Sequence, residues 1–408
     1  MFVSAFAAAF LLCAVPFRQE RAPEPLFPRI IGVATGRNGY EEYISAVDLI
    51  QEPRLARLIE DHLQRSPGQD WLASHERLSA SIRPVLELIR AGNAKPAFDP
   101  RPITVETVMP QLSHFKTLTR LIAAESYLRL SQGDAAGATS AFLDGLTFSH
   151  RISQKAAISN LVSIACISIM LAQLEHRAGT IDRASASRII SWCDKFLATP
   201  NPLMACLESE RQVYAALIEQ LFSSPKRFLA ELRETDPQGA EKYVSEIAGM
   251  SDAERRQRKA QMFERMNERM QLLVRVLREP ENRWVPPISR EVEVFGIEPI
   301  LEGREMIGDA QHLQASAKSR TQIRLLRLHA SIALFRWEYA RLPSDLAELR
   351  QTEYAYDPLS SGPFLYRPLP EMAYELYSQG NSHTGPVHLK MRRTPEGRLD
   401  EQDFRPPG

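Results

Sequence analysis

From about Asn38 to Leu349 the apolar residues mostly recur at helical spacing, and the breaks between apolar stretches carry helix start and stop signals. Two breaks, Asn201-Pro202 and Ser224-Pro225, place a good N-cap residue before a proline that suits the first helical turn. The stretch from Ser251 to Glu254 has the spacing of a capping box. The pattern predicts a mainly α protein, either a multi-helix bundle or an irregular stack of α-hairpins.

Two stretches are expected near the centre of this bundle. The segment from Ala123 to Phe148 predicts a helical hairpin around a Gly133-Asp134 turn. It resembles one tetratricopeptide-type unit, but no second copy follows at the period of about 34 residues that a solenoid needs. The segment 156–174 is uncharged and long enough to cross a membrane. Scattered serines, and amphipathic helices before and after it, favour a helix buried in the bundle.

A long amphipathic helix is predicted over 251–279. Its apolar stripe consists of Met262, Phe263, Met266, Met270, Leu273, Val274 and Leu277. The basic run from Arg255 to Lys259 could attract an anionic lipid surface, but glutamates on the same helix can pair with it at i,i+4 spacing, so a solvated face is expected. The proline-bearing break at 279–287 then divides the chain into a helical body, 21–285, and a second part, 286–408, with one more helix and a small cap.

The amino terminus predicts export. Residues 1–17 carry no charged side chain and fit the apolar core of a secretory signal. The run is slightly shorter than the roughly 20 residues that a spanning helix needs, and Pro16 interrupts it. Segment 1–20 is therefore predicted to be a signal sequence or a short membrane anchor. The protein is expected in the periplasm or cell envelope, with membrane contact only through this segment.

Charge and motifs narrow the function classes. Fifty basic and fifty acidic residues give a formal charge of zero, so no net field attracts nucleic acid. The sequence contains no phosphate-binding glycine loop, H-E-x-x-H, G-x-S-x-G or EF-hand loop, and we expect no cofactor and no metal. The glycines of segment 32–39 lack dinucleotide spacing, which favours a flexible lead into a helix near Tyr40.

Three ionisable residues in apolar surroundings are the catalytic candidates: Glu125, His150 and His329. Burial there could perturb their pKa values, although a single ionisable residue on a helix much more often has a structural role. Cys193 and Cys206 flank the turn 198–202 between two predicted helices, so export would permit a disulfide between them. Two half-buried free thiols are nevertheless the favoured interpretation, because free cysteine is among the most commonly buried residues.

The carboxyl-terminal part carries a family resemblance. Residues 333–349, followed by 356–358, 364–367 and 374–381, resemble the soluble end of type II secretion major pseudopilins. The resemblance implies a helix that ends in a tyrosine- and proline-marked turn and a small antiparallel sheet after it. The order of leader, helical body and tail is also similar to that of a class of bacterial envelope proteins with no assigned activity.

The residues of this tail agree with that fold. Leu342-Pro343 ends a helix and Ser344 can cap a short one after it, whereas 364–366 and 374–377 read as aromatic-rich strands. The chain departs from the family at the amino terminus, which lacks an early glutamate, so polymerisation by the family's route is not expected. Residues 380–383 carry no carboxylate, and calcium is not expected either.

These features predict a non-enzymatic, exported or envelope-associated helical protein that makes protein–protein contacts. Its partners would be envelope proteins, in secretion or surface assembly, and nucleic acid is not among them. The alternative is an enzyme or a small-ligand-binding protein with a pocket between its helices.

Overall fold

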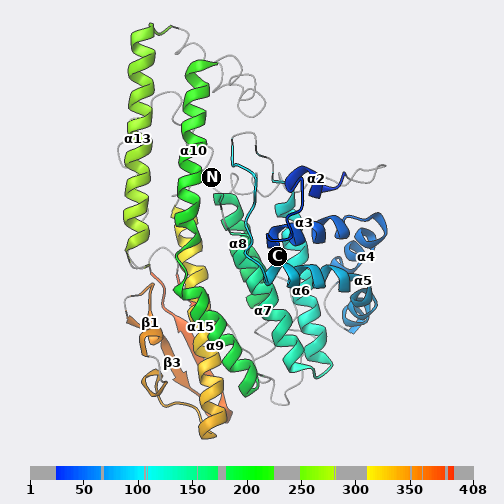
Figure 1. Ribbon diagram of the computed structural model, residues 1–408. Coiled ribbons are helices and arrows are strands. Elements are labelled where there is room, and N and C mark those ends of the chain that lie inside the picture. Colours follow the sequence, from blue (N-terminus) through cyan, green and yellow to red (C-terminus); the bar gives the residue numbers. More distant parts are fainter. Residues whose placement is uncertain are drawn as a thin grey trace.

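The computed structural model describes residues 24–65, 69–104, 107, 109–153, 155–172, 181–224, 249–279, 281, 310–349, 352–360, 362–381 and 385–389. The predicted leader and most of the predicted break at 279–287 lie outside these residues. Helices make up most of the described chain, and a small group of strands lies beside one end of α15 (Figure 1). The prediction of a mainly α protein with a small α/β cap is confirmed.

The helices of the body are α2 (Leu26–Ile30), α3 (Gly39–Ile50), α4 (Pro53–Leu63), α5 (Gln69–Asn93), α6 (Gln111–Ser131), α7 (Ala135–Arg151), α8 (Ala157–Ala172), α9 (Arg183–Ala198), α10 (Pro202–Ser223), α13 (Asp252–Arg278) and α15 (Ala310–Tyr339). The cap contains the 3-10 helices η3 (Leu346–Glu348), η4 (Thr352–Ala355) and η5 (Pro370–Met372), and the strands β1 (Tyr356–Asp357), β2 (Gly362–Pro363), β3 (Leu365–Pro368), β4 (Tyr374–Ser378) and β5 (Val387–His388).

Helix starts follow the local signals in the sequence. Asn201 caps α10 by accepting a hydrogen bond from the Leu203 amide, with Pro202 in the first turn. Ser251 and Glu254 form the predicted capping box of α13. Pro225, of the other predicted start, lies outside the described residues.

The predicted hairpin and the predicted central helix are both present. Gly133 adopts a left-handed conformation between α6 and α7, and the Asp134 carboxylate caps α7 at the Gly137 amide, 2.8 Å away. α8 packs against α6, α7, α10 and α15, as expected for a helix in the middle of a bundle. No helix among the described residues is long and apolar enough to span a membrane.

α3 and α5 cross at two glycines. A Cβ on Gly92 would lie 2.4 Å from the Tyr43 ring, and one on Gly39 would lie 2.2 Å from the Gly92 carbonyl oxygen. Hydrogen bonds join segment 32–38 to the first turn of α3. The Glu41 carboxylate accepts them from the Thr35 and Gly36 amides. The expectation of a flexible lead is therefore corrected, because a carboxylate in the first turn of α3 satisfies the donors of this loop.

α10 and α13 form a two-helix arm that extends beyond the rest of the body (Figure 1). The helices are antiparallel, since Lys259, near the start of α13, pairs with Glu219, near the end of α10, at 2.6 Å. The apolar stripe predicted for α13 faces α10: five of its side chains are buried, and Phe263 and Val274 are partly buried. The opposite face is polar and solvated, which agrees with its charge pattern.

The cap contains two small antiparallel sheets. β1 pairs with β2, and the order β3-β4-β5 forms the second sheet, with Leu365 opposite Tyr377. The two predicted aromatic strands correspond to β3 and β4. Ser344 does not cap the following short helix; Asp345 does, accepting from the Ala347 amide at 2.8 Å, because its carboxylate lies directly at the first turn of η3.

The core is continuous between the two predicted parts of the chain. α15, which the sequence places in the second part, packs along α9 and against α8, and also contacts β4 and β5. Buried side chains from α3 through β5 form one hydrophobic cluster. The second part therefore shares the core of the body within the described residues.

We predict that Gly92→Ala destabilises the protein. A methyl group here meets the buried Tyr43 ring and overpacks the α3–α5 crossing, so the free energy of unfolding should fall by about 2 kcal/mol. Urea denaturation of Gly92→Ala measures this change in the free energy of unfolding. Ala91→Gly, at the exposed neighbouring position of α5, is the comparison. If the crossing did not need a glycine, Gly92→Ala would instead gain up to about 1 kcal/mol from helix propensity.

Candidate functional site

Glu125, on α6, lies at the centre of a buried polar cluster formed with α5. Its carboxylate accepts hydrogen bonds from Ser79 Oγ at 2.9 Å and from Arg129 Nε at 2.8 Å. His75 Nε2 lies 3.7 Å from the same carboxylate, in a fully buried position. Burial alone would raise the pKa of Glu125, but the His75, Arg129 and Ser79 side chains outweigh it and lower that pKa to about 2.

The cluster extends through a second histidine to α4. His75 Nδ1 is 3.2 Å from His62 Nε2, and His62 Nδ1 is 3.3 Å from Ser74 Oγ. His75 Nδ1 and His62 Nε2 share one hydrogen bond, so one ring donates and the other accepts, whereas His75 Nε2 is beyond hydrogen-bond distance of Glu125. Burial is the main cause that lowers the pKa of His62 to about 4, so its ring is neutral at pH 7.

Aromatic rings enclose the two histidines. Trp71 stacks on His75 with ring centroids 5.6 Å apart and lies 4.8 Å from the His62 ring. Tyr127 meets the far edge of Trp71 at 5.8 Å. The rings therefore enclose a chain of hydrogen bonds that runs from Ser74 through His62 to His75, beside Glu125.

The protonation states decide what this chain can do. General acid–base catalysis favours a pKa near the working pH, whereas Glu125 stays ionised and His62 stays neutral at pH 7. Glu125 therefore orients the histidines and joins α4, α5 and α6, and the geometry favours a structural role. Among the described residues, no group of three histidine, cysteine, aspartate or glutamate side chains could hold a metal ion.

His329, on α15, connects the body to the cap. Its Nε2 lies 3.1 Å from the Leu389 carbonyl, which only accepts, so this nitrogen donates and Nδ1 accepts from Tyr374 Oη at 2.9 Å. Burial lowers the pKa of His329 to about 4. Both ring nitrogens are used, and the residue positions β4 and β5 on α15.

His150, on α7, occupies a third environment. Its ring lies 4.7 Å from the Phe196 ring of α9, and burial together with the charges of Arg320 and Arg151 lowers its pKa to about 4. The three residues predicted as candidates thus have separate sets of neighbours and do not form one site. His62 and His75 were not predicted from the sequence, because their separation by thirteen positions on two helices gives no local motif.

Cys193 and Cys206 are free thiols in the structure, as the favoured interpretation of the sequence expects, and the disulfide that export would permit is not formed. Cys206 Sγ donates toward the Ala156 carbonyl, 3.3 Å away in the connection between α7 and α8. Cys193 lies among other neighbours, near Asp194 and Arg327. Both side chains are fully buried rather than half-buried, and burial raises the pKa of Cys206 to about 12.

Exposed aromatic side chains occur in the last turn of α15 and, separately, in β1 of the cap. Trp337 is 62% exposed, Tyr339 50% and Tyr356 53%. Trp337 Nε1 donates to the Ile181 carbonyl at 3.1 Å, which fixes the indole at the start of α9 while its rings face solvent. Tyr339 lies 4.5 Å from the Phe335 ring, one turn earlier. We call Trp337 and Tyr339 the aromatic surface.

No protein-family model matches the chain, and neither a curated protein nor a solved structure matches it. The geometry of these residues is therefore the basis on which a function can be assigned.

We predict that Glu125→Gln lowers the free energy of unfolding by about 3 kcal/mol at pH 7. The pKa of Glu125 is lower in the folded state, so its contribution is complete above its ordinary value of 4.5 and is lost as pH falls toward about 2. Denaturation curves of wild type and Glu125→Gln should thus converge as pH falls through this window. Glu76→Gln, at an exposed position on α5, is the control, and an equal loss in both variants would contradict the prediction.

We predict that His329 makes the fold sensitive to acid. Its pKa is depressed in the folded state, so protons bind the unfolded chain first, and stability present above pH 6.5 is lost as pH falls toward 4. The contribution is about 3 kcal/mol at most. His329→Gln can keep both hydrogen bonds without titrating and should flatten the dependence of the urea midpoint on pH. His388→Gln controls for the loss of a histidine, and an unchanged slope in His329→Gln would refute the assignment.

Proposed function

We propose that this protein is a non-enzymatic, helical protein of the cell envelope that binds a partner protein through the aromatic surface. The observation that carries the proposal is the exposure of Trp337 and Tyr339 in the last turn of α15. Tryptophan and tyrosine are enriched at the centres of protein interfaces, where they bury a large area with few rotatable bonds.

The support behind these side chains suits a binding surface. The indole of Trp337 is fixed by the Ile181 carbonyl, and Tyr339 lies against the ring of Phe335, so both are ordered before a partner arrives. A preorganised side chain loses less entropy on binding. Charged groups flank the surface, including Glu338, whose side chain lies 3.9 Å from Arg183, and provide a polar rim.

The place in the envelope follows from the sequence. The uncharged leader favours export, and the tail that resembles pseudopilins is the part of the chain that carries the aromatic surface. A partner in secretion or surface assembly is therefore the expected class. α15 carries this surface and packs against α9 and α8, so the surface is anchored to the core of the body.

Site-specific photocrosslinking in the host envelope tests the proposal. A photoreactive phenylalanine analogue at Tyr339 should give one discrete adduct with a partner protein. The same analogue at Leu58, an exposed apolar position of α4, is the matched control and should give no such adduct. Trp337→Ala in the Tyr339 probe protein should reduce the adduct at least tenfold, because the loss of an interface hot spot costs about 2 kcal/mol or more.

Two results would contradict this function. Equal adducts at Tyr339 and Leu58 would mean unspecific proximity, and an adduct insensitive to Trp337→Ala would separate binding from the aromatic surface. Thermal unfolding of Trp337→Ala, which removes one hydrogen bond, shows whether a lost adduct comes instead from a lost fold.

A further inference from the structure

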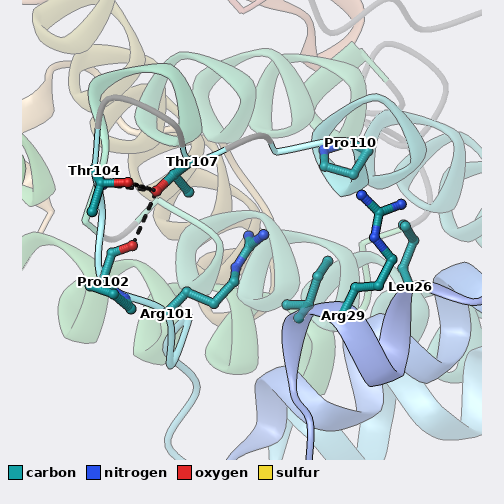
Figure 2. Close-up of a pocket in the computed structure, with 8 residues that line it drawn as sticks. Leu26, Arg29, Arg101, Pro102, Thr104, Thr107 and Pro110 are labelled. Atoms are coloured by element: carbon teal, nitrogen blue, oxygen red, sulfur yellow. Dashed lines mark hydrogen bonds between the residues drawn. The ribbon is translucent and has the colours of Figure 1, made fainter.

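A cavity of about 360 Å³ lies between α2 and the connection from α5 to α6. Figure 2 shows side chains from both sides bordering this space: Arg29 and Leu26 from α2, and Arg101 and Thr107 from the connection. The volume is at the lower end of the range of small-molecule sites, about 300–1,000 Å³. The cavity is far from the aromatic surface, so a ligand site here is independent of the proposed function.

Arginine side chains line the cavity from both sides. The Arg29 guanidinium is exposed and has no ion-pair partner among the described residues. Arg101 is held in a fixed orientation, because Nε and Nη2 donate to the two oxygens of the buried Asp99 at 3.1 and 2.7 Å. In Figure 2 both guanidinium groups reach into the space between the two walls. Guanidinium groups suit carboxylate and phosphate, which they bind through two parallel hydrogen bonds.

Two acidic groups near the cavity, Asp99 and Asp48, are occupied by donors of its own walls. Asp99 accepts from Arg101, and Asp48 accepts from the Leu26 and Phe27 amides at the start of α2, at 2.6 and 2.9 Å. Lys155 adds a further positive charge behind the wall, since its Nζ donates to the Arg101 carbonyl at 3.0 Å. Arg29 is thus the group left to recognise an incoming charge.

The rest of the lining is apolar or locked in place. Leu26 and Ile30 are almost fully buried and border the cavity from α2. On the other wall, Thr107 Oγ1 accepts from the Thr104 amide at 2.8 Å and donates to the Pro102 carbonyl at 3.2 Å, which holds the connection in shape. Apolar walls beside a fixed cationic edge favour a ligand with both characters.

We propose that this cavity binds a small organic anion, with a carboxylate or phosphate head at Arg29 and Arg101 and a short apolar body against Leu26 and Ile30. Asp99 acts as a positioning residue by fixing the Arg101 guanidinium.

Titration calorimetry with the full chain tests this site, with octanoate, octyl phosphate, neutral octanamide and inorganic phosphate as probes. Octanoate or octyl phosphate should bind, and whichever binds more tightly identifies the head group. Octanamide should bind at least tenfold more weakly because it has no negative charge. Inorganic phosphate should also bind at least tenfold more weakly because it has no apolar body. Arg29→Gln should weaken the better probe about tenfold, the value of one charged hydrogen-bonding group. Arg83→Gln, at an exposed position of α5, should leave the affinity unchanged.

Hydrogen exchange locates the binding independently of the variants. Octanoate or octyl phosphate should slow exchange in α2 and in the α5–α6 connection, and not in the α10–α13 arm. The proposal is overturned by absence of binding of both anions, by equal affinity for octanamide, by equal affinity for inorganic phosphate, or by full affinity in Arg29→Gln.

Discussion

The fold depends on one buried cation. Arg327, in the middle of α15, is 1% exposed, and its Nε donates to Asp194 of α9 at 2.5 Å. Its guanidinium also lies 3.8 Å from the centre of the Tyr354 ring, in η4 of the cap. Removing a guanidinium from water costs several kcal/mol, which the carboxylate and the ring partly offset. Through these two contacts Arg327 links α15 to α9 and to the cap.

Other polar contacts along α15 also join this helix to the body and to the cap. His329 connects the helix to β4 and β5, and His312 Nε2 lies 3.0 Å from Asn160 Oδ1 of α8. Trp337 closes the contact with the start of α9. α15 therefore joins body and cap, and the aromatic surface at its end rests on a helix that is held by the core on several sides. This explains how exposed rings can be held in place at the boundary of a small cap.

Local signals in the sequence predicted much of the fold. The capping box at Ser251, the proline start after Asn201 and the aromatic strands of the cap each depend on neighbours within a few positions. Spacing alone therefore identifies them. The choice between Ser344 and Asp345 as a cap was missed because it depends on the rotation of a single turn.

The candidate site could be predicted only in part. Glu125 stands out as a carboxylate in an apolar run, but its partners His75 and His62 come from two other helices, whose packing order the sequence does not state. The cysteine pair shows the same limit. Cys193 and Cys206 are close in sequence, yet the helices that carry them turn the thiols toward different neighbours. The cavity beside Arg29 likewise arises from segments that only the tertiary fold brings together.

The central claim is that the cap and the body unfold as one unit because α15 serves both. Native-state hydrogen exchange of Arg327→Met tests it most directly, with Arg324→Met, one turn away, as the control. We expect the amides of α9 and of β4 to lose protection together, by the same factor, in Arg327→Met alone. Loss of protection confined to β4, with α9 unchanged, would contradict the claim.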